Sequence, residues 1–308
     1  MGSRPINPPS ILDQRALFFC KHDFCEIHSF PPLDMVKQGI PIARRMEKPL
    51  VCITLRGRSV AEMVKDSSKA VEMGADLLEV RLDNLWSSEE INSNSEESKN
   101  DSEEAEMEVN FSIMSFEEVD FSDCIREISE SVDSPLLFTC RSQNHGGLFP
   151  GSEDERVEVI RSAIDAEPDW IDLEVDISSG HRDDLLELAS GKTKVIASLH
   201  SMDETPPPSE IVQDVIDAEK MGEIVKACFA TKDRKDALKI FEAAMELKSS
   251  NQKLTLMGLG PGGDWVRIHS PILDQHIVYA TTESGWHLSQ QGRINASDLK
   301  VAWDLLGY

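Results

Sequence analysis

The 308-residue sequence predicts an α/β protein built as a single (β/α)8 TIM barrel. From residue 50 onward, short apolar segments rich in β-branched residues alternate with longer amphipathic segments. Eight such strand–helix steps fill about 260 residues, which is the usual size of one barrel. The first strand–helix turn, Arg56-Gly57-Arg58-Ser59, lacks a Gly-x-Gly-x-x-Gly pattern, which disfavours the alternative of a doubly wound dinucleotide-binding sheet.

The elements of the predicted barrel follow from these two periodicities. The predicted strands cover residues 50–55, 76–82, 135–141, 169–175, 194–200, 223–229, 253–258 and 276–281. The predicted helices cover residues 59–73, 116–131, 153–166, 182–190, 208–221, 232–247 and 296–306. The seventh connection, 259–275, has room for at most one helical turn. Ser152 and Asn295 are expected to be helix N-caps, and Gly222 is expected to end the fifth helix.

Two segments lie outside this pattern. Residues 1–48 contain several prolines and no sustained period, which predicts an N-terminal extension of unknown role before a barrel at 49–308. Residues 87–114, after the second strand, are rich in Ser, Glu and Asn and almost devoid of apolar side chains. Such a composition buries too little apolar surface to fold, so we expect an acidic, disordered insertion.

The charge and apolar content exclude several classes of protein. The net charge of -25 disfavours binding to nucleic acid or to anionic membranes, and residues 89–133 alone hold 16 acidic and two basic residues. No apolar run approaches the roughly 18 to 20 residues that span a bilayer. The segment 17–20 is too short for the apolar core of a signal peptide. We therefore expect a cytoplasmic protein.

The six cysteines fit the same compartment. Cys52, Cys140 and Cys228 fall in predicted strands, where they are expected to be buried and reduced. The N-terminal segment also holds a cluster that zinc would accept, with the residues Cys20, His22, Cys25 and His28. The Cys-x4-Cys spacing is loose for zinc and no second half-site follows, so free thiols are favoured.

Lys226 interrupts the apolar strand 223–229, where a lysine is unusual. Burial and nearby arginines would lower the pKa of its amine, which as a neutral group attacks carbonyl carbon. The preceding strand, 194–200, ends on His200, whose pKa is expected near neutrality. An amine and an imidazole on adjacent strands suffice for imine chemistry with proton transfer. The alternative is a snorkelling lysine and a hydrogen-bonded core histidine.

Other polar residues cluster at the carboxyl ends of the predicted strands, where barrel active sites lie. They are Glu79, Arg81 and Asp83, Arg141, His145 with Gly146 and Gly147, Asp172 and Glu174, and Arg267 after the seventh strand. Three arginines and a lysine among carboxylates predict a site for an anionic, hydroxylated ligand, and a salt-bridged barrel interior is the alternative. In such a site Lys226 would form an iminium ion and His200 would move the adjacent proton. The expected reaction is β-elimination of water or carbon–carbon cleavage.

These residues make the sequence resemble the type I 3-dehydroquinate dehydratases, the Schiff-base enzymes of the shikimate pathway. The resemblance covers residues 48–308 apart from the acidic insertion. The motifs that carry it are Glu79-Val-Arg81, Thr139-Cys-Arg141, Gly146-Gly147, Ser198-Leu-His200, Thr205-Pro206, Ile224-Val-Lys226, Met257-Gly258, Arg267, Ser289 and Gly292.

The resemblance implies a hydro-lyase, a carbon–oxygen lyase of aromatic amino acid biosynthesis. Lys226 would form the imine with the C3 ketone of 3-dehydroquinate, and His200 would remove the C2 proton and help the C1 hydroxyl to leave. Arg267 and Ser289 would hold the carboxylate. Glu79, Arg81 and Arg141 would order the ring hydroxyls and the charge balance around the amine. The resemblance also implies a homodimer that needs no cofactor and no metal.

Two positions depart from the family pattern. His145 stands where the family has a glutamate beside the catalytic histidine, and Arg293 stands where it has a glutamine near the substrate, in a position still able to bind a carboxylate. These changes leave open a non-catalytic or re-specified family member that binds a related hydroxy acid. A class I aldolase-type barrel acting on a sugar phosphate is also open, because several glycines follow the seventh strand: Gly258, Gly260, Gly262 and Gly263.

Overall fold

The computed structural model describes residues 48–90, 110–248, 250 and 252–308. All of them belong to one compact unit, Arg45–Tyr308. The predicted N-terminal extension, with its candidate zinc cluster, lies outside the described residues, so its separation from the barrel stays a prediction. Within the described part, no helix combines the length and the apolar content that crossing a bilayer requires.

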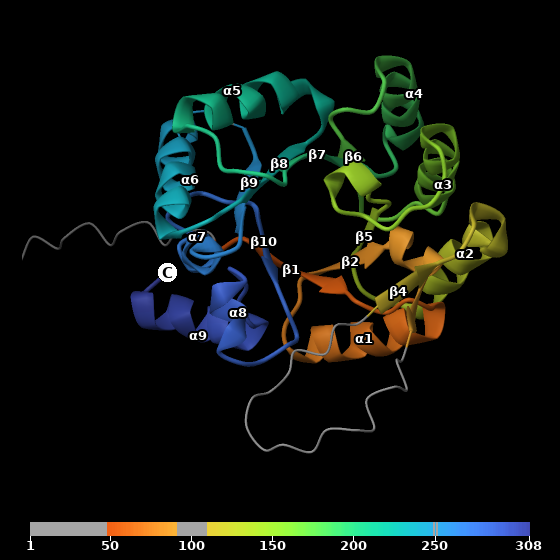
Figure 1. Ribbon diagram of the computed structural model, residues 1–308, viewed down its shortest axis with the longest axis horizontal. Coiled ribbons are helices and arrows are strands. Elements are labelled where there is room, and N and C mark those ends of the chain that lie inside the picture. The colour runs from red at the N-terminus through yellow and green to blue at the C-terminus, as the bar shows by residue number, and fades with distance from the viewer. Residues whose placement is uncertain (1–47, 91–109, 249, 251) are drawn as a thin grey trace, which may run out of the picture. The chain divides into compact units, whose positions relative to one another are not determined.

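Eight parallel strands form the sheet of a (β/α)8 barrel, which confirms the predicted fold (Figure 1). They are β1 Leu50–Leu55, β2 Leu77–Arg81, β5 Leu136–Thr139, β6 Trp170–Glu174, β7 Lys194–Ser201, β8 Ile224–Ala230, β9 Leu254–Leu259 and β10 Ile277–Ala280. Their order is β10-β1-β2-β5-β6-β7-β8-β9. At the two ends of this order, the amide of His276 donates to Leu254 O at 2.9 Å and the hydroxyl of Thr255 donates to Ile277 O at 3.2 Å. These bonds draw β9 and β10 together.

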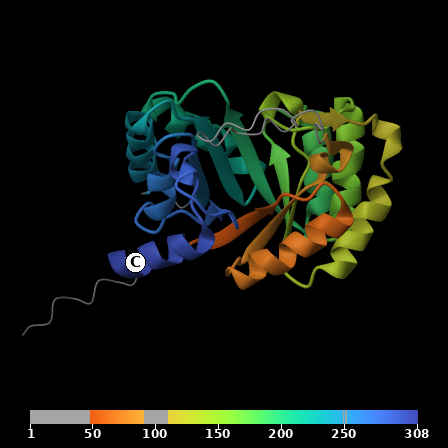
Figure 2. The same cartoon turned by 60° about the horizontal axis from the view of Figure 1, so that its bottom comes forward.

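The helices surround the strands and follow the predicted segments closely (Figures 1 and 2). They are α1 Val60–Glu72, α2 Phe121–Ser131, α3 Glu153–Asp165, α4 Ser179–Ala189, α5 Pro208–Ala218, α6 Arg234–Leu247, α7 Gly263–Ile268, α8 His287–Gln290 and α9 Ala296–Leu306. Short 3-10 turns are η3 Leu82–Trp86, η4 Phe116–Glu118, η5 Gln143–His145 and η6 Glu219–Met221.

Capping residues explain where the helices begin. Ser152 forms a capping box with Glu155, and the side chain of Asn295 accepts the Ser297 amide, as predicted. The predicted segment 116–131 is divided into η4 and α2, because Asp120 caps a new helix there. Helix α4 begins three residues before the predicted position 182, because Ser178 accepts the His181 amide. Gly222 ends η6 and not the α-helix itself.

The insertion follows the second strand as predicted, but its bounds of 87–114 are too wide, because residues at both ends form strands. β3 Ser87–Glu90 and β4 Asn110–Ile113 pair as an antiparallel ribbon, in which the hydroxyls of Ser88 and Ser112 lie 2.7 Å apart. The aromatic rings of Trp86 and Phe116 stack at 5.8 Å just outside the ribbon and fix its base. The sequence did not predict this pairing, because the average hydrophobicity of residues 87–114 is low. Residues 91–109 lie outside the described residues.

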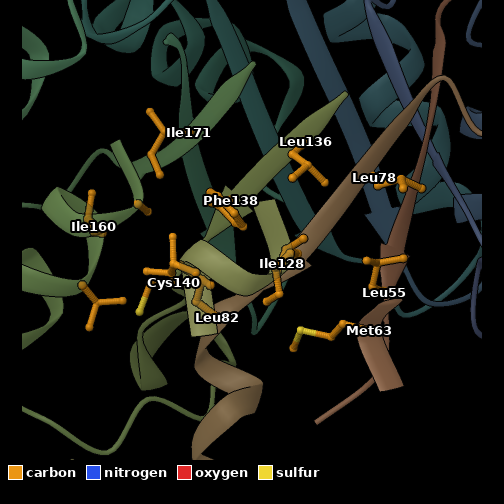
Figure 3. Close-up of a cluster of buried hydrophobic side chains, with 14 of the residues drawn as sticks. Leu55, Met63, Leu78, Leu82, Ile128, Leu136, Phe138, Cys140, Ile160 and Ile171 are labelled. Carbon is orange, nitrogen blue, oxygen red and sulfur yellow. The ribbon is translucent and has the colours of Figure 1, made fainter. Parts of the chain in front are cut away.

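The core has two parts with different chemistry. Between sheet and helices, apolar side chains such as Leu55, Met63, Phe138 and Ile160 pack together (Figure 3). Inside the barrel, an apolar layer of residues such as Leu77, Leu137 and Ile224 fills the amino-terminal half. Inward-facing residues recur every second position, so Glu79 and Lys226 come next along their strands. The carboxyl-terminal half of the barrel interior is therefore charged.

Candidate active site

A cavity of about 380 Å³ opens at the carboxyl-terminal mouth of the barrel. It brings together seven of the eight predicted site residues: Glu79, Arg81, Arg141, His200, Lys226, Arg267 and Arg293. Ser289 is not among the residues that line it. The strands deliver these side chains to one place because all eight run in the same direction.

Lys226 is buried on β8 and lies between two carboxylates. Its Nζ atom is 3.2 Å from Oε1 of Glu79 and 3.2 Å from Oδ2 of Asp172, and 4.4 Å from the centroid of the Tyr279 ring. Burial lowers the pKa of the amine, but Glu79 and Asp172 outweigh that effect and raise it. The expected low pKa and neutral amine are thus wrong for the free protein, because the two carboxylates act on the amine more strongly than burial and Arg141 do.

Arg141 organises the charges beneath the cavity. Its Nη2 donates to Oδ2 of Asp172 at 2.9 Å, and its Nη1 donates to Oε1 of Glu174 and to Oγ of Ser198, both at 2.9 Å. Burial alone would lower its pKa, but Asp172 and Glu174 raise it, so the guanidinium stays charged. With these donors engaged by protein groups, Arg141 is better placed to fix Asp172 than to bind ring hydroxyls.

Glu79 and Arg81 enter the cavity from β2. Glu79 accepts hydrogen bonds from the hydroxyls of Thr54 at 2.6 Å and Thr139 at 3.1 Å, so its carboxylate is fixed toward Lys226. Arg81 forms a two-point ion pair with Asp83, with bonds of 2.8 and 2.7 Å. This pair holds the plane of the guanidinium at the cavity wall.

His200 lies next to Lys226 at the mouth of the barrel. On neighbouring strands, Lys226 is in register with Ser198, and His200 is in register with Cys228 two residues further on. Burial, Arg141 and Lys226 together lower the pKa of His200 to about 2, so the expected value near neutrality is wrong and the ring is neutral. Its Nδ1 atom is buried and has no hydrogen-bond partner among the described residues.

His145 approaches His200 from the loop after β5. The two ring centroids are 5.3 Å apart. Nδ1 of His145 lies 3.4 Å from Oε1 of Glu174, and Nε2 lies 3.4 Å from Oδ2 of Asp176. The Glu174 carboxylate raises the pKa of His145. The loop can take this path because Gly147 has no side chain: a Cβ there would lie 2.0 Å from Arg141 O.

Arg267 occupies the opposite side of the cavity, but it is already bonded to the backbone. Nε donates to Tyr279 O at 3.0 Å, while Nη1 donates to the carbonyls of Gly258 at 2.8 Å, Gly263 at 3.0 Å and Gly292 at 2.7 Å. Burial lowers its pKa to about 10. A two-point grip on a substrate carboxylate is therefore incompatible with this arrangement. The remaining nitrogen, Nη2, donates to Sδ of Met257 at 3.9 Å and is the one best placed to turn to a ligand.

Ser289 and Arg293 flank the turn after α8. Ser289 donates to Oδ2 of Asp264 at 2.7 Å, which holds its hydroxyl away from the cavity lining. Arg293 lines the cavity, donates to the Thr281 hydroxyl at 2.9 Å and pairs with Glu283 at 2.8 Å. Gly292, with φ of 68°, lets the turn approach β9 closely, since a Cβ there would lie 2.0 Å from Gly260 O.

Two residues that donate hydrogen bonds to Glu79 in the cavity were not among the predicted site residues. Thr54 and Tyr279 lie within apolar strands, and both donate to Glu79, the latter at 3.4 Å. The alternation of inward- and outward-facing residues could have predicted Thr54, because Thr54 and Glu79 are in register on the neighbouring strands β1 and β2.

The glycine-rich stretch after β9 does not form a phosphate cradle. The amide of Gly260 donates to Gln291 O and that of Gly263 donates to Gly260 O. The carbonyls of Gly258 and Gly263 turn toward Arg267 instead. A phosphate site needs free amides at this position, so the sugar-phosphate alternative loses its support.

Among the described residues, His145, Glu174 and Asp176 could hold a metal ion, because one donor atom of each lies within 4.8 Å of the others. Glu174, however, is already 2.9 Å from Arg141 and 3.2 Å from Arg156. The two guanidinium groups oppose binding of a cation, and we assign no metal to this cluster.

Comparison with known proteins agrees with this geometry. The family model of type I 3-dehydroquinase matches residues 51–308. The 3-dehydroquinate dehydratase of Methanopyrus kandleri is 25% identical over 259 residues, which cover 84% of this chain and 100% of the relative. That of Methanosarcina acetivorans is 27% identical over 282 residues, covering 89% and 98%.

Solved structures share the fold. The type I 3-dehydroquinate dehydratase from Clostridium difficile, solved with covalently modified comenic acid, superposes with a TM-score of 0.68 at 21% identity, over 85% of this chain and 94% of that one. The enzyme from Geobacillus kaustophilus gives 0.67 at 20% identity, over 84% and 91%. With a matching model across the whole barrel, the chain belongs to the type I 3-dehydroquinase family.

Proposed function

We propose that the protein is a 3-dehydroquinate dehydratase, which eliminates water from 3-dehydroquinate to give 3-dehydroshikimate through an imine on Lys226. One observation carries the proposal: a buried lysine on β8 lies beside a neutral histidine on β7, at the mouth of an arginine-lined cavity. Family membership supplies the substrate. The homodimer and the cytoplasmic location remain predictions.

The carboxylates beside Lys226 fit an imine mechanism even though they favour the ammonium form. An ammonium ion and a ketone combine to give an iminium ion and water, so the positive charge is the same before and after. Glu79 and Asp172, each 3.2 Å from Nζ, would therefore stabilise the iminium as they stabilise the ammonium. The small fraction of free amine is the species that attacks.

The low pKa of His200 keeps its imidazole in the neutral form that can accept a proton, but it also makes the ring a weak base. A neutral imidazole is ready to take the C2 proton, which the neighbouring iminium has made acidic. The imidazolium that results lies near Arg141 and Lys226 and is a strong acid there. It would pass its proton readily to the departing C1 hydroxyl, which leaves as water.

We assign the substrate carboxylate to Arg293 together with Nη2 of Arg267. Both side chains line the cavity on the side of β9 and β10, and Arg293 is partly exposed, so it is available to a ligand. This differs from the expected pair of Arg267 and Ser289, since Ser289 is bonded to Asp264. Arg81, held by Asp83, would face the ring hydroxyls.

Borohydride trapping tests the proposal, because borohydride reduces an imine to a stable secondary amine. The protein is incubated with 3-dehydroquinate and borohydride and then weighed intact, and turnover is measured separately. One added ligand per chain at Lys226, with turnover, is the expected result. Trapping without turnover would indicate a degenerate or re-specified family member, to which the departures at His145 and Arg293 point. Binding without a mass increase would reject covalent catalysis.

A further inference from the structure

A second hollow of about 350 Å³ lies against the two histidines of the site. Its rim carries three exposed carboxylates, Asp176, Asp214 and Asp217. His145 and His200 line both this hollow and the substrate cavity, so the two imidazole rings form a wall between them.

The wall has donor and acceptor atoms on both sides. The ring centroids of His145 and His200 are 5.3 Å apart with an angle of 39° between the rings, close enough to connect directly after a small rotation or through one water. Nδ1 of His200 is buried without a partner among the described residues. On the far side, Nε2 of His145 is 3.4 Å from Asp176, which is 52% exposed.

We propose that His145 relays protons between His200 and the water of this acid-rimmed hollow. The inference rests on the proposed dehydratase function and concerns how the same site exchanges protons. His145 touches no reacting atom, so it is a positioning and relay residue and not a catalytic one. A glutamate, the residue that the family pattern has at this position, offers only acceptor oxygens when ionised, whereas a neutral imidazole accepts at one nitrogen and donates from the other.

The relay is balanced in protons. When one ring nitrogen of His200 takes the C2 proton, a C–H bond breaks and an N–H bond forms. The other nitrogen then passes its proton to Nδ1 of neutral His145, which must turn from Glu174, now 3.4 Å away, to accept it. Nε2 of His145 releases a proton to Asp176 or to water. The relay acts between the two steps of the elimination: the reverse path returns a proton to His200, and the imidazolium then passes it to the leaving hydroxyl. One proton leaves for each that enters, so the overall elimination is unchanged.

The charges around the two rings favour this direction. Arg141 and Lys226 oppose a positive charge on His200. The groups that face His145 are Glu174 from β6, Asp176 just after it, Arg141 after β5 and His200 on β7, and the first two outweigh the others. A proton is therefore held more easily on His145 than on His200.

Replacement of His145 by alanine tests the relay, with His269→Ala as the matched control. His269 bonds to Tyr308 at 2.7 Å and lies outside both hollows. For His145→Ala we expect kcat to fall about tenfold or more, KM to change less than about twofold, and free imidazole to restore much of the lost rate. The acid limb of the wild-type pH profile, which reports protonation of His145, should also disappear. An unchanged rate and pH profile would overturn the relay.

Asp176→Asn provides a second variant whose folding is not in question, because Asp176 is exposed. It removes the outer acceptor and should lower kcat in the same direction by a smaller factor. Full activity in both variants, with a wild-type protein that turns over substrate, would reject the relay and leave the dehydratase assignment intact. A wild-type protein without turnover or borohydride trapping would instead reject the proposed function, and the relay would fall with it.

Discussion

The Nζ atom of Lys226 and the Oε1 atom of Glu79 lie 3.2 Å apart, although 147 residues separate them in the chain. Both side chains are buried, and Asp172 completes the arrangement on the other side of the amine. The group that we assign as nucleophile thus also neutralises two carboxylates, and removing it has consequences for both activity and stability.

Lys226→Ala should abolish turnover and borohydride trapping, because no amine remains to form the imine. It should also destabilise the fold by about 3 kcal/mol, since Glu79 loses its cation while Asp172 keeps Arg141. Urea denaturation measures the free energy of unfolding. Lys65→Ala, at an exposed position of α1, is the matched control and should behave like wild type. Turnover near the wild-type rate in Lys226→Ala would refute imine catalysis.

Deletion of residues 91–109 should leave the melting temperature nearly unchanged, because their composition cannot bury enough apolar surface to stabilise the fold. Glu90 and Asn110 are paired across β3 and β4, so an Asn-Gly turn can join them as a two-residue hairpin.

Deletion of the whole segment 87–114 should lower the melting temperature clearly. It removes the ribbon, including the bond from the Met114 amide to Trp86 O. Equal melting temperatures for the two deletions would show that the ribbon contributes nothing to stability.

Acid should destabilise the protein through the cluster below the cavity. Burial raises the pKa values of Asp172 and Glu174, but Arg141 beside both, Lys226 beside Asp172 and His145 beside Glu174 outweigh it and lower them. A depressed pKa in the folded state adds stability above about pH 4, which is lost as the pH falls further.

Unfolding free energies measured between pH 7 and pH 2 check this expectation. The slope below pH 4 should be shallower in Glu174→Gln, which lacks one of these carboxylates. Asp184→Asn, at an exposed position, is the control. Identical slopes in wild type and Glu174→Gln would contradict the assignment of acid sensitivity to this cluster.

Arg293→Gln, which introduces the residue of the family pattern, should weaken substrate binding. Loss of a charge-assisted contact with the substrate carboxylate predicts a rise in KM of about tenfold, with a smaller change in kcat. Steady-state kinetics with 3-dehydroquinate measures both constants. Arg234→Gln, on α6 and outside the cavity, is the control. An unchanged KM would place the carboxylate elsewhere in the cavity.

The barrel could be predicted because its signal is repeated eight times, and an error at one strand leaves the others intact. The position of Lys226 beside His200 followed from strand order alone, since parallel neighbours present their carboxyl ends together. The ionisation of both groups could not be predicted this way. It depends on which carboxylates lie within about 4 Å of each group, and strand register fixes that more finely than periodicity does.

The backbone partners of Arg267 could not be predicted for a related reason. Its partners are backbone carbonyls of Gly258, Gly263, Tyr279 and Gly292. Every residue has a backbone carbonyl, so the sequence does not indicate which ones will accept a hydrogen bond from an arginine. The bond from Ser289 to Asp264 was missed for another reason: the two side chains are 25 residues apart in the chain, and no periodicity places them together. The ribbon of β3 and β4 was missed because the average composition of a segment does not show that its two ends pair.

Arg267 bridges β9 and β10, the two strands at which the order of the sheet ends. Hydrogen bonds of His276, Thr255 and Gln275 cross the gap between these two strands near the base, and the one guanidinium joins Gly258 to Tyr279 near the mouth. Amide hydrogens of β10 should therefore exchange with solvent sooner than those of β7, whose both edges are paired. Arg293, to which the substrate carboxylate is assigned, lines the cavity on this less firmly paired side of the barrel, whereas β7 and β8, which carry His200 and Lys226, are paired along both edges.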